Sequence, residues 1–148
     1  MAETLILGEL TGKSLDPITG EMIAAAKGIS DNVRVALMGL DLDHLAEQVI
    51  AIGADEVFIV HDPLLSADCI EAHVYAFEQI CKLTMPAVVL TGKTPMGREV
   101  GPRVAFSLGM GVSQDSISVK ISADSGRVVS TRPVYGGNAL ATVEFLDG

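Results

Sequence analysis

Four short apolar segments, each followed by residues with helical spacing, constrain the fold of this chain more than any other feature. They lie at residues 4–7, 33–38, 56–60 and 87–90. Their apolar residues run continuously and do not alternate with polar ones, which is typical of strands buried on both faces of a parallel sheet. The sequence therefore predicts an α/β fold, with a three-layer, doubly wound, mostly parallel sheet.

Capping residues set the expected helix boundaries. Asp16 followed by Pro17 predicts an N-cap and a first helical residue. Asp43 and Ser66 are expected to cap the second and third helices in the same way. Pro102 has no N–H to donate and is tolerated only in the first turn of a helix. We therefore expect the fourth helix to begin near residues 97–99.

The hydrophobic pattern changes after Gly111. Ile117, Val119 and Ile121 alternate with polar residues, and alternation returns at residues 139–145. This pattern predicts antiparallel strands appended to the parallel sheet. Residues 132–138 lie between two of these strands and are expected to form a glycine-rich loop.

Length and charge limit the function classes. A chain of 148 residues is sufficient for one domain, assigned here to residues 1–148, with a single sizeable core. The net charge of -9 argues against nucleic acid and anionic membrane surfaces as partners. Residues 1–92 carry a net charge of -10, from 4 basic and 14 acidic side chains, whereas residues 93–148 carry +1, from 6 and 5. An anion site is therefore expected at or after Lys93.

Targeting and redox signals are few. The N-terminus fits neither a signal peptide nor a transit peptide, and no apolar run reaches about 18 residues, so we expect a cytoplasmic protein of a prokaryote without membrane insertion. Cys69 and Cys81 show no C-x-x-C spacing and are interpreted as reduced, buried residues.

Other familiar site patterns are incomplete. The turn at residues 8–14 resembles a P-loop, but it has three residues between its glycines where the phosphate cradle needs four. No G-x-G-x-x-G follows a predicted strand, so the dinucleotide fingerprint is missing. The histidines lie on three different elements without ligand spacing, and no metal site is predicted; they are His44, His61 and His73.

The turn after the fourth apolar segment is the better candidate for a ligand site. A flexible loop that leads into a helix N-terminus can bind phosphate through free N–H groups and the helix dipole. The candidate nucleotide-binding residues are Thr91, Gly92, Lys93, Thr94, Gly97 and Arg98. The alternative is that Arg98 and Arg103 pair with Glu99 or with acidic residues of a partner subunit. The residues alone leave both readings open.

Three segments resemble the electron transfer flavoprotein α subunit. They are the T-G-K-T-P-M-G-R-E-V-G-P-R-V-A-F-S-L-G run at residues 91–109, R-P-V-Y-G-G-N-A at 132–139 and G-A-D-E-V at 53–57. The resemblance covers all 148 residues but only the N-terminal half of the family's subunit. It implies an α/β domain of the adenine-nucleotide α-hydrolase type. The family's FAD-binding domain would begin just after residue 148, so the resemblance implies that these 148 residues lack the main FAD site, either as a fragment or as a stand-alone relative whose flavin domain is elsewhere.

The resemblance also implies a function. The chain would be an electron-transfer component, not an enzyme, and would pair with a β subunit that binds AMP or a second FAD. FAD of the full complex would perform the redox chemistry, with a flavin-linked dehydrogenase or quinone oxidoreductase as redox partner. In the β subunit, the nucleotide would lie at the fourth strand-to-helix turn. The matching turn in this chain is at residues 91–98, and in most α subunits that turn holds no nucleotide.

A second set of residues is implied to face the β subunit and the flavin; it comprises Arg132, Pro133, Tyr135, Gly136, Gly137 and Asn138. The alternative from another class is a small AMP- or ATP-binding module of the universal-stress type. Such a module would use the turn at residues 91–98 for phosphates.

Overall fold

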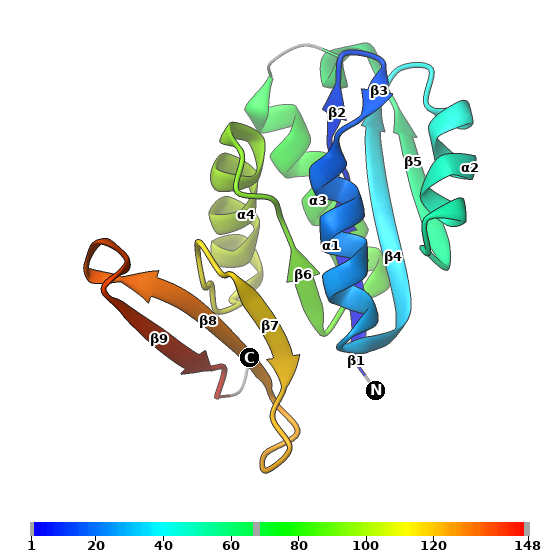
Figure 1. Ribbon diagram of the computed structural model, residues 1–148. Coiled ribbons are helices and arrows are strands. Elements are labelled where there is room, and N and C mark those ends of the chain that lie inside the picture. The colour runs from blue at the N-terminus through cyan, green and yellow to red at the C-terminus, as the bar shows by residue number, and fades with distance from the viewer. Residues whose placement is uncertain (1, 67–68, 147–148) are drawn as a thin grey trace.

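The computed structural model describes residues 2–66 and 69–146, which form a parallel sheet between two layers of helices and a smaller antiparallel sheet (Figure 1). The parallel sheet has the strand order β5-β4-β1-β6. Its strands are β1 (Ala2–Leu7), β4 (Ser30–Gly39), β5 (Glu56–His61) and β6 (Val88–Leu90). All three strand pairings are parallel, as the continuous apolar segments predict.

Helices cover both faces of this sheet. The first face is packed by α1 (Pro17–Lys27) and α2 (Asp43–Ala51), and the second by α3 (Ile70–Thr84) and α4 (Pro95–Leu108). Successive β1 residues point to opposite faces: Ile6 belongs to the cluster with α1 and α2, whereas Leu5 and Leu7 belong to the cluster with α3 and α4. The predicted three-layer α/β class is confirmed.

The predicted N-caps are correct for one helix and wrong for two. Asp16 caps α1, because its Oδ1 accepts a hydrogen bond of 2.9 Å from the Ile18 N–H. Asp43 is the first residue of α2, and the N-cap is the fully buried Leu42, which makes no side-chain cap. The Leu42 N–H donates to Nε2 of His61 at 3.3 Å, which connects the start of α2 to the end of β5.

Ser66 does not cap α3 either. It ends the short 3₁₀ helix Pro63–Leu65, and its hydroxyl donates to the Pro63 carbonyl at 2.6 Å. The N-cap of α3 is Cys69. The Asp62 carboxylate caps the 3₁₀ helix, because it accepts a hydrogen bond of 2.9 Å from the Leu64 N–H. Asp62 and Ser66 therefore cap the two ends of the short 3₁₀ helix, and neither caps α3.

The predicted start of α4 near residues 97–99 is also wrong. The helix begins at Pro95, and Pro102 lies inside it. Thr94 followed by Pro95 supplies both an N-cap and a first-position proline, the same pair of signals that starts α1. The preference of Pro102 for the first turn is overridden by this stronger start signal seven residues earlier and by packing of the helix on the sheet.

The C-terminal strands form a sheet of their own. It has the order β7-β8-β9, and both pairings are antiparallel. The strands are β7 (Ser118–Ile121), β8 (Val128–Val134) and β9 (Ala139–Glu144). Part of the predicted loop at residues 132–138 is therefore strand, and only Tyr135–Gly137, a short 3₁₀ turn, and Asn138 join β8 to β9.

Among the residues that the structure describes, no helix combines the length and apolar character needed to cross a lipid bilayer.

Leu37 offers a direct test of the core. Its side chain is fully buried between β4 and the first helical layer, whereas Leu40 just beyond the same strand is 45% exposed. Leu37→Ala is expected to lower the free energy of unfolding by about 3 kcal/mol, because it removes buried contacts and leaves a cavity. Leu40→Ala, the matched control, should change it by less than about 0.5 kcal/mol. Urea denaturation measures both, and equal losses would contradict the assigned core.

Candidate functional site

The candidate site lies where two neighbouring strands of the parallel sheet end. Residues 4–6 of β1 pair in register with residues 88–90 of β6, so Glu9 and the turn at residues 91–94 leave the sheet at the same edge. Open α/β sheets place their ligand sites at this carboxyl edge. The structure thus brings the predicted residues of this turn together with an acidic residue that the sequence did not single out.

The Thr94 hydroxyl connects these two segments. Its Oγ1 donates to Oε1 of Glu9 at 2.6 Å and accepts from the Gly97 N–H at 3.0 Å. Pro95 has no N–H, and the Arg98 N–H donates to the Thr94 carbonyl at 2.9 Å. Of the N–H groups that a phosphate could use at the α4 N-terminus, that of Gly97 is therefore already bonded to Thr94, and Pro95 supplies none.

Glu9 is a buried acid beneath this turn. Only 8% of the residue is exposed to solvent, and the Oε2 atom of its carboxyl has no hydrogen-bond partner among the described residues. Burial raises the pKa of Glu9, and the nearby Asp16 adds to the rise, whereas the hydrogen bond from Thr94 opposes it. The backbone around Glu9 is fixed by Thr19, whose Oγ1 accepts from the Glu9 N–H at 3.0 Å.

Glycines let the turn fold back onto its helix. A Cβ placed on Gly97 would lie 2.0 Å from the Gly92 carbonyl oxygen, and one on Gly92 would lie 2.5 Å from Oε2 of Glu9. One on Gly101 would lie 2.7 Å from Oγ1 of Thr91. These close approaches show that the Gly92 backbone and the side chains of Glu9 and Thr91 leave no room for a Cβ at these three positions.

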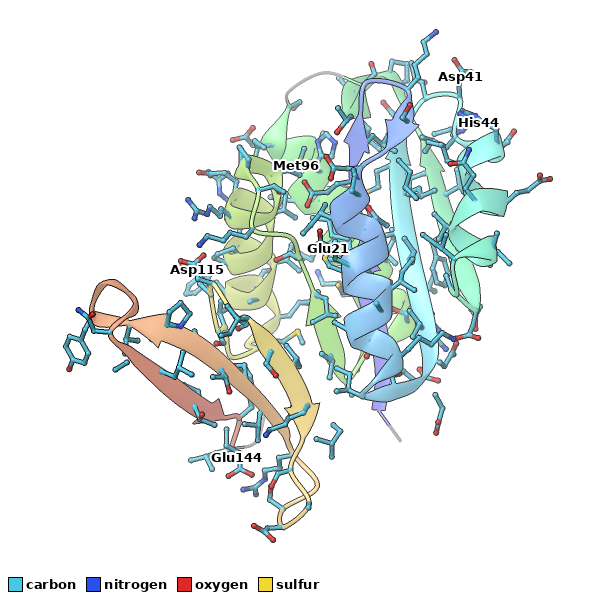
Figure 2. The ribbon with its side chains drawn as sticks, viewed as in Figure 1. Glu21, Asp41, His44, Met96, Asp115 and Glu144 are labelled. Carbon is cyan, nitrogen blue, oxygen red and sulfur yellow. The ribbon has the colours of Figure 1, made fainter. Side chains whose placement is uncertain are left out.

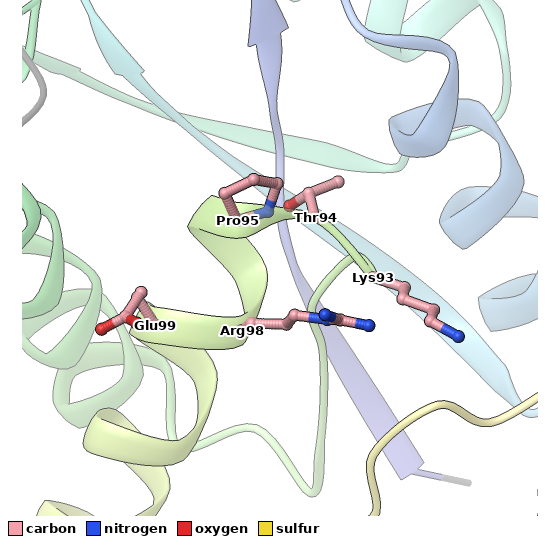
Figure 3. A pocket seen from close by; sticks show the side chains of 5 residues that line it. All are labelled: Lys93, Thr94, Pro95, Arg98 and Glu99. Atoms are coloured by element: carbon pink, nitrogen blue, oxygen red, sulfur yellow. The ribbon is translucent and has the colours of Figure 1, made fainter.

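The two basic residues of the turn point outward. Figure 3 shows Lys93 and Arg98 extending to the same side, with Glu99 on the other. Together with Thr94 and Pro95, these three residues line a hollow of about 420 Å³. Both cations approach Oδ1 of Asp115, at 3.5 Å from Lys93 and 3.6 Å from Arg98. Asp115, labelled in Figure 2, lies in the connection between α4 and β7.

Arg103 follows the alternative interpretation from the sequence. It pairs with Glu99 at 2.9 Å, one turn away on α4, and with Glu71 of α3 at 3.5 Å. Arg98 pairs with Asp115 instead. The basic residues of this region are therefore engaged with the chain's own carboxylates.

The remaining candidates from the sequence occupy structural positions. The P-loop-like turn forms a hairpin of β2 (Leu10–Thr11) and β3 (Ser14–Leu15). His73 is buried, with Nδ1 2.8 Å from the Cys69 carbonyl oxygen. Burial raises the pKa of the Cys81 thiol to about 11, which keeps it protonated and unreactive near neutral pH.

The second predicted set lies at the tip of a hairpin. Arg132 and Pro133 are in β8, and Tyr135, Gly136, Gly137 and Asn138 form the connection to β9 (Figure 1). Tyr135 is 84% exposed and adopts a positive φ of 52°. The Arg132 Nε is buried and has no hydrogen-bond partner among the described residues.

A large groove was not anticipated from the sequence. It has a volume of about 1120 Å³ and runs along β6, between α1, α4 and the antiparallel sheet. Its lining includes Met22 of α1, Leu108 of α4 and Phe145 after β9. Sequence reasoning also missed Glu9 and Asp115; the only signals were an acid directly after the first apolar segment and an acid soon after Gly109.

The fold places the chain among three-layer α/β domains, with a four-stranded parallel sheet between helices and a three-stranded antiparallel sheet after it. Residues 4–148 match the electron transfer flavoprotein domain, and the chain belongs to the electron transfer flavoprotein family. It is 33% identical over 146 residues to an electron transfer flavoprotein subunit alpha of Thermoanaerobacterium thermosaccharolyticum, covering 96% of this chain and 44% of that protein.

Two further relatives agree. An electron transfer flavoprotein subunit alpha of Megasphaera elsdenii is 35% identical over 136 residues, which cover 92% of this chain and 40% of the relative. Protein FixB of Azorhizobium caulinodans is 30% identical over 138 residues, covering 88% and 37%. The chain thus spans less than half the length of these relatives, and the resemblance noted from the sequence is confirmed.

Gly97→Ala tests the close packing of the turn. The added Cβ would overlap the Gly92 carbonyl, so we expect the free energy of unfolding to fall by about 2 kcal/mol or more. Gly20→Ala in α1 is the matched control, because its Cβ would meet nothing closer than 3.8 Å. That change should be neutral or stabilise by up to about 1 kcal/mol. A harmless Gly97→Ala in chemical denaturation would contradict the packing.

Glu9→Gln tests the buried carboxyl through pH. Because the pKa of Glu9 is raised in the folded state, the wild-type carboxyl favours folding most below its ordinary value of 4.5 and loses that contribution as pH rises through the folded pKa. The amide has no such dependence. Glu9→Gln is therefore expected to be more stable than wild type at pH 7 and no more stable at pH 4.

The control for this comparison is Glu47→Gln, which removes the same charge from an exposed position on α2. Its stability relative to wild type should change little between the two pH values. Urea midpoints measured at both pH values provide the readout. A Glu9→Gln difference that does not depend on pH would show that the carboxyl is not buried as described.

Proposed function

We propose that this chain is the N-terminal domain of an electron transfer flavoprotein α subunit and pairs with a β subunit to form a flavin-dependent electron carrier. The observation that carries the proposal is the family match over residues 4–148, to relatives that are α subunits. In this role the chain has no substrate of its own. It contributes position and electrostatic surroundings, and the flavin of the complex performs the redox chemistry.

The antiparallel sheet supports a partner-binding role. The outer edge of β9 pairs with no strand among the described residues. The backbone N–H and C=O groups of such an edge can form hydrogen bonds with a strand of another chain. Large apolar side chains are exposed nearby, including Tyr135 at 84%, Leu140 at 63% and Leu146 at 68%. We propose that this sheet and the predicted set at residues 132–138 contact the β subunit and the edge of the flavin site.

The cofactors are assigned to the complex, not to the turn at residues 91–98. FAD would bind mainly outside this chain, and AMP or a second FAD in the β subunit. The residues of the turn do not favour a phosphate, because the Glu9 carboxyl lies beneath Gly92 and the Asp115 carboxylate faces Lys93 and Arg98. A flavin-linked dehydrogenase or a quinone oxidoreductase would be the redox partner.

The alternative of a small AMP- or ATP-binding module is less well supported. It needs an open phosphate site at the α4 N-terminus, where Thr94 already takes the Gly97 N–H. It also needs cations that are available to phosphate, whereas Lys93 and Arg98 both approach Asp115.

Association with the β subunit of the source organism tests the proposal. Co-expressed chains should copurify as a one-to-one complex. Leu140→Asp places a charge on the exposed antiparallel sheet, and we expect it to weaken the association by about tenfold or more. Leu83→Asp, on a side chain 77% exposed on α3, is the matched control and should leave the association unchanged.

Size-exclusion chromatography and surface plasmon resonance provide the affinities. Circular dichroism confirms that both variants remain folded. No association by the wild-type chain would contradict the proposed function. A stoichiometric, tightly bound FAD in the isolated chain would contradict the assignment of the flavin to the complex.

A further inference from the structure

The turn between β6 and α4 has the ingredients of an anion site and yet contains two carboxyl groups. It leaves the carboxyl edge of a parallel sheet, leads into the N-terminus of a 14-residue helix and carries Lys93 and Arg98. Such a turn attracts phosphate. Here Glu9 occupies its inner side and Asp115 its outer side.

We propose that Glu9 and Asp115 are specificity-determining residues that close this turn to phosphate groups. The inference deepens the proposed function, in which this domain carries no nucleotide, by naming the residues that exclude one. The excluded ligand is a phosphate group, either free inorganic phosphate or the phosphate monoester of an adenine nucleotide.

Glu9 acts from within. The Glu9 carboxyl accepts from the hydroxyl of Thr94, which in turn accepts from the Gly97 N–H, so a carboxyl group already lies beside the helix N-terminus where an anion would bind. Its Oε2 is buried, has no partner among the described residues and lies where a side chain on Gly92 would be. When ionised, this oxygen repels a phosphate close by, in surroundings that screen charge poorly.

The other charged groups around Glu9 do not offset this repulsion. Asp16, at the start of α1, adds negative charge, and its own carboxylate accepts from the Thr11 hydroxyl and from the Ile18 N–H. Lys93 and Arg98 lie on the outer side of the turn and approach Asp115.

Asp115 acts from outside. One oxygen of this residue faces both cations of the turn, which is the place a phosphate oxygen would take between a lysine and an arginine. The residue adopts a positive φ of 55°, a conformation that non-glycine residues seldom hold. The connection between α4 and β7 thus presents the carboxylate to the basic pair.

The test removes both charges without changing side-chain shape. The double variant Glu9→Gln/Asp115→Asn keeps the acceptor for Thr94 and is compared with wild type and with Glu47→Gln/Asp124→Asn. That control changes the net charge equally at exposed positions away from the turn. Each full chain is titrated with inorganic phosphate and with AMP by calorimetry and by amide chemical shifts.

We expect the double variant to bind both probes about tenfold or more tightly than wild type and control, with shifts centred on Gly92, Gly97 and Arg98. Adding Arg98→Ala should abolish the gain. If the double variant binds AMP more tightly than phosphate, the turn is a nucleotide site, and if it binds both equally, the turn is a plain anion site. Both results support the proposal that Glu9 and Asp115 close the turn to phosphate groups. No gain, or an equal gain in the control, overturns it.

Asp115→Asn alone keeps the test decisive if the double variant does not fold. Asp115 is exposed, so this variant is expected to fold and to show a smaller gain, whereas no gain overturns the role of Asp115. If the phosphate and AMP titrations contradict this inference, the chain should still associate with the β subunit. If the proposed function is wrong, the wild-type chain should fail to associate with the β subunit.

Discussion

The hydroxyl of Thr94 holds together the parts of the molecule on which the candidate site depends. It caps α4 through the Gly97 N–H and bonds the Glu9 carboxyl at the end of β1. This one oxygen atom therefore connects the segment after the central strand β1, the turn after the edge strand β6 and the N-terminus of α4. The start of α4, the path of the turn and the burial of Glu9 are set together, and the glycines at positions 92 and 97 allow the backbone to approach closely enough.

The parallel core could be predicted from the sequence because its signals are local. Apolar runs of four to six residues specify strands that are covered on both faces, and Asp16 with Pro17 specifies a helix start. Predictions failed where two local signals competed. Asp43, Ser66 and Pro102 are each plausible at a helix start, but a buried Leu42, a preceding 3₁₀ helix and the Thr94–Pro95 pair decide the actual boundaries.

The candidate site could be predicted only in part, because its decisive contacts are long-range. The turn itself is visible as a glycine-rich loop between a strand and a helix. Glu9, however, lies 85 positions from Thr94 in the sequence, and Asp115 reaches Lys93 and Arg98 only through the connection after α4. No spacing rule links such residues, since their proximity follows from the parallel register of β1 and β6 and from the path of the chain after the last helix.

Charge along the sequence also differs from charge in space. The sequence places the acidic excess before Lys93 and a small basic excess from Lys93 onward, which favoured an anion site in the later part. In the folded chain those cations face carboxylates: Lys93 and Arg98 approach Asp115, and Arg103 bridges Glu99 and Glu71. Exposed pairs of this kind contribute little stability, often below about 1 kcal/mol each. Their larger effect is on recognition, because a cation that already faces a carboxylate offers less attraction to an incoming anion. The partner surface that we propose is instead the antiparallel sheet, where exposed apolar side chains lie near a strand edge that pairs with no strand among the described residues.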